Sequence, residues 1–83
     1  MQRYVVEHEF AQPLTPEGFE QSSKKAGPCY QQHGVVWMAS YLSSDGMKMI
    51  CEFEAESAEQ VRDALRSAEV PFARVWPAHK YQR

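Results

Sequence analysis

The stretch 35–53 constrains the fold more than any other part of the sequence, because it has the pattern of a two-stranded hairpin. Two runs rich in β-branched and aromatic residues flank the tripeptide Ser44-Asp45-Gly46. Asp-Gly between apolar runs is typical of a tight turn, since glycine tolerates the positive φ that such a turn needs. Both faces of the first strand are mainly apolar, so neither face is expected to lie fully in water.

Two helices are predicted on either side of this hairpin. The first begins at Thr15-Pro16, with threonine as the N-cap and proline at the first helical position. Gly27-Pro28 is expected to kink or split it, because proline lacks the amide proton and clashes with the preceding turn. The second helix follows a capping box over 57–60 and has a clear apolar face.

A strand over 4–10 and a short strand over 72–78 complete a β-α-β-β-α-β order. Right-handed crossovers turn this order into the ferredoxin-like α+β fold, with a four-stranded antiparallel sheet and both helices on one face. The first strand is then expected beside the third. The whole chain, 1–83, is expected to form this single domain.

Alternation of side chains along the strands divides the sheet residues into two sets. The set expected to face the helices is Val6, Phe10, Trp37, Tyr41, Met49 and Phe53. The opposite, open face is expected to carry Val5, Val36, Met38, Leu42 and Ile50 beside Glu7, Glu9, Lys48, Glu52 and Glu54. Those aliphatic side chains need cover, and a second copy packed sheet against sheet would supply it. We therefore expect a homodimer that forms an α/β barrel.

Size and charge exclude several classes of protein. In a domain of 83 residues a single hydrophobic core supplies only ~3–5 kcal/mol of stability, so stabilisation by a partner is common. The formal net charge of −2, from 9 basic and 11 acidic residues, gives no electrostatic case for binding nucleic acid or a membrane surface. No apolar run is long enough for a membrane span, and the N-terminus lacks the apolar core of a signal peptide. A cytoplasmic location is expected.

A set of residues between positions 37 and 71 carries a family resemblance. These residues are Trp37, Ser40, Tyr41, Asp45, Cys51, Ala55, Glu59, Val61, Arg62 and Pro71. In them the chain resembles a family of small bacterial ferredoxin-like proteins of unknown function that are described as nickel-responsive or nickel-binding. The resemblance implies a dimeric α/β barrel and a divalent metal, nickel, as the cofactor.

The chain departs from the family pattern at two places where that pattern has histidine. These places are Ala39 and Ala64 here. Ala39 is expected on the helix-facing side of its strand and Ala64 near the inner edge of the second helix, so the two positions could approach one another. Imidazole is the usual ligand for nickel and alanine cannot ligate, which puts nickel binding through these positions in doubt.

Acidic residues on adjacent strands form the first candidate site. Like charges this close are unfavourable unless a cation or partial protonation relieves them, which suggests a divalent-cation or small-ligand site in the barrel lumen. The candidate ligands are Glu7, Glu9, Glu52 and Glu54, with His8 nearby only if its strand is irregular, and the supporting residues are Lys48, Arg74 and Ser40. The alternative, which we favour, is a solvated sheet face with Lys48 and Arg74 as counter-charges.

Cys29 is a candidate reactive thiol. If a helix restarts at Pro28, Cys29 lies in its first turn, where the helix dipole lowers a thiol pKa. The favoured alternative is a small apolar residue packed beneath the helix.

Three functions remain open from the residues alone. The first is a non-enzymatic binding protein for a metal ion or small ligand. The second is a small dimeric-barrel enzyme of the isomerase or cofactor-free monooxygenase type, with Glu52 or Glu7 as acid or base and Arg74 orienting an anionic substrate. The third is a purely structural or partner-binding module.

Overall fold

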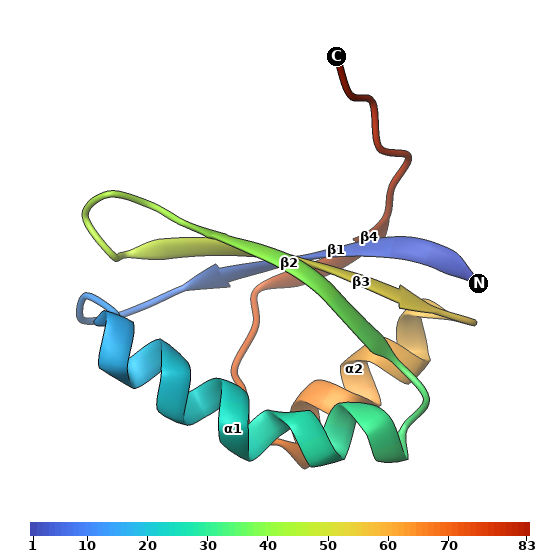
Figure 1. Ribbon diagram of the computed structural model, residues 1–83, viewed down its shortest axis with the longest axis horizontal. Helices are drawn as coiled ribbons and strands as arrows, with labels where there is room; N and C mark the ends of the chain where they lie inside the picture. The colour runs from blue at the N-terminus through green and yellow to red at the C-terminus, as the bar shows by residue number, and fades with distance from the viewer.

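Six secondary-structure elements follow one another in the predicted order. They are β1 (Gln2–Glu9), α1 (Pro16–Gln32), β2 (Val36–Leu42), β3 (Lys48–Ala55), α2 (Ala58–Ser67) and β4 (Arg74–Pro77). The computed structural model describes residues 1–83. Its four strands form one antiparallel sheet in the order β2-β3-β1-β4, and both helices lie against one face of it (Figure 1). The predicted ferredoxin-like α+β fold is confirmed, including the pairing of the first strand with the third.

The densest part of the core lies between α2 and the central strands. Val61, Ala64 and Leu65 of α2 are completely buried, and Val6 and Phe53 of the sheet are at most 1% exposed. Burying an aliphatic or phenylalanine side chain contributes roughly 1.5–3 kcal/mol. This contact therefore supplies much of the free energy of folding. Neither α1 nor α2 combines the length and the apolar character that a membrane span requires.

The helix α1 continues through Pro28, so the predicted split at Gly27-Pro28 is wrong. The N-cap is as predicted, since Thr15 Oγ1 accepts a hydrogen bond of 3.0 Å from the Gly18 amide. Proline at position 28 removes one bond, the one to the carbonyl of Lys24. Because Lys24 is exposed, water can satisfy that carbonyl and the helix need not end.

A β-bulge in β2 changes which side chains share a face. Trp37 and Ala39 pair with consecutive residues of β3, so Met38 is an extra residue in the strand. One extra residue inverts the alternation of side chains beyond it. Ala39 and Tyr41 therefore lie on the open face, and Leu42 lies on the helix side. The sequence predicted the reverse for all three residues.

The hairpin turn is fixed both internally and from outside. Gly46 has a φ of 77°, as the Asp-Gly signal predicted. Asp45 Oδ1 accepts hydrogen bonds from the Met47 amide (3.0 Å) and the Ser43 hydroxyl (2.7 Å). The Gly46 carbonyl accepts a bond of 2.8 Å from the Leu14 amide, which ties the turn to the segment that leads into α1.

The side chain of Gln60 joins the start of α2 to the end of α1. The backbone amide of Gln60 donates to Ser57 Oγ (3.1 Å), which is the N-cap bond of the predicted capping box. The reciprocal bond differs, because Gln60 Oε1 accepts from the Glu56 amide (2.8 Å) rather than from the Ser57 amide. Gln60 Nε2 also donates to the His33 carbonyl (2.6 Å), so the start of α2 is fastened to the end of α1.

The turn generates a prediction about Gly46. A Cβ at this position would lie 3.1 Å from the Leu14 carbonyl oxygen, and the left-handed backbone costs a non-glycine residue roughly 1–2 kcal/mol. We expect Gly46→Ala to lower the free energy of unfolding by at least about 1 kcal/mol in urea denaturation. The exposed control Ser44→Ala should stay within about 0.5 kcal/mol of the wild type. Equal stability of the two variants would contradict the assigned turn.

Candidate functional site

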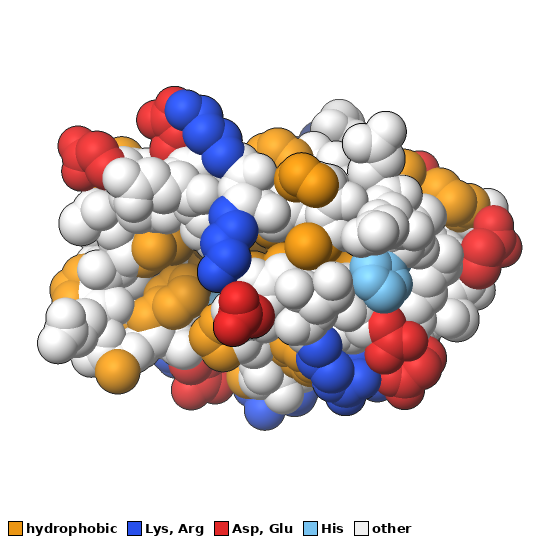
Figure 2. Space-filling model, turned by 90° about the horizontal axis from the view of Figure 1, so that it is seen from below, with side chains coloured by type: hydrophobic (Ala, Val, Ile, Leu, Met, Phe, Trp, Pro, Cys, Tyr) orange, Lys and Arg blue, Asp and Glu red, His pale blue; other side chains and the backbone are white.

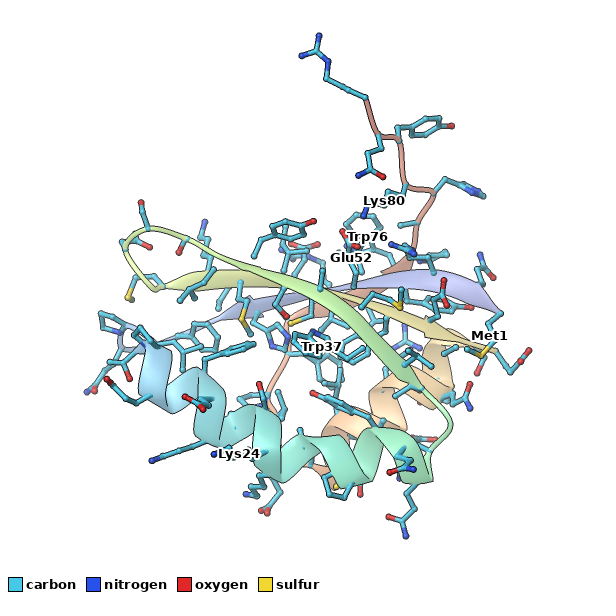
Figure 3. All side chains as sticks on the ribbon, viewed as in Figure 1. Met1, Lys24, Trp37, Glu52, Trp76 and Lys80 are labelled. Atoms are coloured by element: carbon cyan, nitrogen blue, oxygen red, sulfur yellow. The ribbon has the colours of Figure 1, made fainter.

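A pocket of about 680 Å³ lies between α1 and the sheet, on the side away from the open face. Aromatic and aliphatic side chains form much of its wall: Phe10, Phe19, Tyr30, Val35, Trp37 and Met49. Figure 3 shows Trp37 between the sheet and α1. In the view from the helix side, hydrophobic side chains reach the surface at the end of the molecule where α1 begins (Figure 2).

The pocket exists because α1 presents small residues to it. Gly18, Ser22, Ser23 and Gly27 of α1 all line the pocket, and none of them is large enough to fill the space beneath the helix. Ala26 is the only buried residue of α1. The thin apolar face of this helix therefore leaves the β2 half of the sheet incompletely covered.

His8 forms part of the pocket wall and is 2% exposed. Its Nδ1 lies 2.9 Å from the Pro71 carbonyl oxygen, which can only accept, so Nδ1 carries the proton. Its ring is stacked with that of Phe10 at 6.1 Å between centroids. Burial lowers the pKa of His8, and the bond to Pro71 opposes this only in part. The neutral ring therefore leaves Nε2 as a bare acceptor, and this buried atom has no hydrogen-bond partner.

A short chain of hydrogen bonds runs along the wall from β2 to β3. Trp37 Nε1 donates to Ser40 Oγ at 2.9 Å, and the Ser40 hydroxyl donates to Cys51 Sγ, also at 2.9 Å. Burial raises the pKa of Cys51, and the bond from Ser40 opposes the rise. The thiol therefore stays protonated at neutral pH.

The remaining polar groups of the pocket carry no unpaired charge. Burial is the main cause that raises the pKa of Tyr30 to about 12, so its hydroxyl stays neutral. Lys25 and Glu69, at the rim, neutralise one another with Nζ 3.4 Å from Oε1. The site can thus enclose an uncharged molecule without leaving a charge buried and unpaired.

The acidic residues predicted as ligands lie on the open face and are held by basic partners. Figure 3 shows Glu52, Trp76 and Lys80 on the side of the sheet opposite Trp37. Arg3, which the sequence reasoning did not consider, bridges Glu52 at 2.9 Å and Glu54 at 3.3 Å, and Lys80 lies 3.8 Å from Glu52.

Glu7 has the most complete set of partners on the open face. Arg74 donates to both of its carboxylate oxygens, at 3.2 and 3.1 Å, and Trp76 Nε1 donates at 2.6 Å. These bonds, from Arg74 first and then Trp76, lower the pKa of Glu7. A carboxylate held in this way is a weak base. Glu9 lies 3.8 Å from Arg74 and pairs across the strands with Lys48.

The predicted site residues do not converge on one metal-binding point. No group of three or more His, Cys, Asp or Glu side chains is placed to hold a metal ion. His8 and Ser40 lie on the helix side of the sheet and the four glutamates on the open side. The sequence carried a signal for His8, because it alternates with the apolar Val6 and Phe10 on the face that packs against the helices.

The positions of Ala39, Ala64 and Cys29 in the fold contradict two further predictions. Ala39 lies on the open face, whereas Ala64 is completely buried on the helix side, so the two do not approach one another. Cys29 lies in the last turn of an unbroken α1 rather than the first turn of a new helix. The helix-dipole argument for a reactive Cys29 therefore does not apply.

Comparison with known proteins places the chain beside one family. A family model described as "Nickel responsive protein SCO4226-like" matches residues 4–77. Among solved structures, the crystal structure of SCO4226 from Streptomyces coelicolor A3(2) superposes with a TM-score of 0.86, at 14% sequence identity, over 96% of this chain and 99% of that one. At this identity the superposition supports the fold alone. No curated protein matches the chain.

The state of His8 predicts how stability depends on pH. Its pKa is lower in the folded protein than in the unfolded chain, so the unfolded chain binds more protons as the pH falls below about 6.5. The free energy of unfolding should therefore fall between about pH 7.5 and pH 5.5, by at most ~1.4 kcal/mol per pH unit from this residue. We expect His8→Gln to show a shallower slope in parallel denaturation series. An unchanged slope would contradict a buried, neutral His8.

Proposed function

We propose that this chain, which belongs to the SCO4226-like family of nickel responsive proteins, is a homodimeric binding protein that holds a small apolar ligand between α1 and the sheet. The observation that carries the proposal is the pocket itself. Its volume of about 680 Å³ lies within the range of roughly 300–1,000 Å³ that is common for small-molecule sites. Its wall is largely apolar with a few polar groups, as in such sites.

Binding is favoured over catalysis by the state of the titratable groups. The enzymatic alternative required Glu7 or Glu52 as an acid or base, and both are engaged by basic side chains. In the pocket, the pKa values of Cys51 and Tyr30 are raised, so neither supplies an anion at neutral pH. A pocket without an anionic nucleophile suits reversible binding.

Filling the pocket tests this proposal directly. The neutral dye N-phenyl-1-naphthylamine brightens in apolar sites, and we expect a saturable rise in its fluorescence with the wild-type protein. Ser23→Phe places a ring on the pocket-lining side of α1 and should weaken dye binding at least about tenfold, because the added ring occupies the site. Circular dichroism would verify that the variant keeps its helices.

The matched control is Glu20→Phe on the same helix. Glu20 is exposed and does not line the pocket, so this variant adds the same ring outside the site and should bind the dye as the wild type does. Absence of saturable binding by the wild type, or equal weakening by both variants, would refute a ligand site beneath α1.

We further propose that a second copy covers the open face. Large hydrophobic side chains on this face are exposed: Val36 at 45%, Tyr41 at 56%, Ile50 at 43% and Trp76 at 41%. An antiparallel sheet packed face to face with a copy of itself would bury them and give the α/β barrel. The partnered acidic and basic side chains beside them leave little net charge to oppose this contact.

A charge introduced at the centre of that face should weaken the dimer. We expect light scattering to give the mass of two chains for the wild type at micromolar concentration. Ile50→Glu should raise the dissociation constant at least about tenfold, because it buries a carboxylate without a partner.

Lys24→Glu is the control for this experiment. Lys24 lies on the outer side of α1 (Figure 3), so the same change of residue type there should leave the mass of two chains unchanged. A wild-type protein that stays monomeric would overturn the barrel and leave the pocket proposal intact.

Nickel does not fit the residues of a single chain. The positions at which the resemblance implies histidine are alanine here. They lie on opposite sides of the sheet, and no cluster of three ligating side chains replaces them. We therefore assign the pocket to an organic ligand.

We propose a cytoplasmic location for this dimer. Both cysteines are free, and Cys29 is partly exposed. Free, accessible thiols suit a reducing compartment.

A further inference from the structure

We infer that the pocket selects uncharged, largely aromatic molecules that carry one O–H or N–H group, and that this group donates a hydrogen bond to His8 Nε2. The inference rests on the proposed function, because it assumes that the pocket is a ligand site. The inference adds the chemical class of the ligand and names His8 as the residue that recognises its donor group.

The tautomer of His8 determines what the ligand must offer. The Pro71 carbonyl, 2.9 Å from Nδ1, holds the ring proton on that nitrogen. Nε2 is consequently an acceptor, and neither a side chain nor a backbone amide of the protein donates to it. Buried acceptors are nearly always paired, and His8 lines a large pocket, which points to a partner from outside the chain.

The apolar surroundings make this acceptor selective. A site that is built to hydrogen-bond a polar group rejects an analogue that lacks it, because the buried protein atom is then left unpaired. His8 is held by the bond to Pro71 and by stacking against Phe10, so it cannot turn to find another partner without losing both contacts.

The charges around the pocket restrict the ligand further. Cys51 and Tyr30 are neutral for the reasons given above, and the ion pair at the rim satisfies Lys25 and Glu69. An ionised ligand would lose its hydration without gaining a counter-charge. An uncharged ligand pays no such cost.

The shape of the wall favours planar rings. Phe19 and Trp37, which both line the pocket, lie with tilted rings and centroids 6.2 Å apart, and Tyr30 meets Phe53 edge to face at 5.0 Å. Aromatic side chains at these separations prefer offset or edge-to-face contacts with other rings. A fused two-ring ligand would supply such contacts while its single donor reaches His8.

A pair of ligands that differ only in the donor tests the inference. Isothermal titration calorimetry should show that the wild-type protein binds 2-naphthol about tenfold or more tightly than 2-methoxynaphthalene, which is the same ring system without the O–H. In protein labelled with ¹⁵N at histidine, the Nε2 resonance of His8 should move upfield with 2-naphthol and stay in place with the ether.

Two variants assign the preference to Nε2. His8→Phe keeps a stacked ring and removes the acceptor, so it should bind both ligands with equal affinity. His8→Gln retains an acceptor oxygen and should keep part of the preference. If either variant fails to fold, the ligand pair and the ¹⁵N spectrum of the wild type still decide the question.

The outcomes separate this inference from the function on which it rests. Equal affinity for both ligands with an unmoved Nε2 resonance would overturn the inference, since Nε2 would then accept no bond from the ligand. The binding function would stand. Failure of both ligands and of the naphthylamine dye to bind would overturn the binding function and the inference together.

Discussion

The contrast between the two helices is the constraint on which the rest of this structure depends. The helix α2 presses Val61, Ala64 and Leu65 into the sheet until none of them is exposed. The helix α1 is longer, yet Ala26 is its only buried residue. Because close packing requires side chains that fill the space between layers, one half of the sheet is sealed and the other half remains hollow.

The sheet itself separates two different environments. On the helix side, His8, Cys51 and Tyr30 are neutral because they are buried, and the charges of Lys25 and Glu69 are paired. On the open side, charged groups are numerous and are paired with one another in the presence of water. The two faces of the sheet therefore offer largely separate surfaces to a ligand and to a second copy, with Val36 contributing to both.

Much of the fold could be predicted from local signals. The Asp45-Gly46 turn, the Thr15 cap and the apolar face of α2 each depend on a few neighbouring residues, and each was correct. The bulge at Met38 could not be predicted, because it depends on the register against β3 rather than on the sequence of β2. This single residue misplaced Ala39, Tyr41 and Leu42. The helix continued through Pro28 because one unpaired carbonyl on an exposed turn is a small cost.

The candidate site was harder to predict than the fold. Like charges on adjacent strands suggested a cation site at the glutamates. Arg3, however, bridges Glu52 and Glu54, and it lies near the N-terminus and meets them only through the pairing of β1 with β3. The sequence linked His8 to the acidic site only if its strand were irregular, and the regular pairing of β1 places it on the opposite face, beside Phe10. What the sequence could not reveal is that the Pro71 carbonyl engages one ring nitrogen and leaves the other bare, because that contact spans 63 residues of chain.

The way in which α1 is attached has a consequence for how a guest molecule could come and go. Its leading end is held through Leu14 to the hairpin turn, and its trailing end through His33 to Gln60. Between these two ends, Pro28 removes one of the backbone hydrogen bonds of the helix. Because α1 is fixed at both ends and lacks one backbone hydrogen bond at Pro28, it would bend between the two attachments rather than rotate about one end. A ligand would thus reach the pocket beneath the middle of α1, while the bonds of Leu14 and His33 at its two ends stay intact.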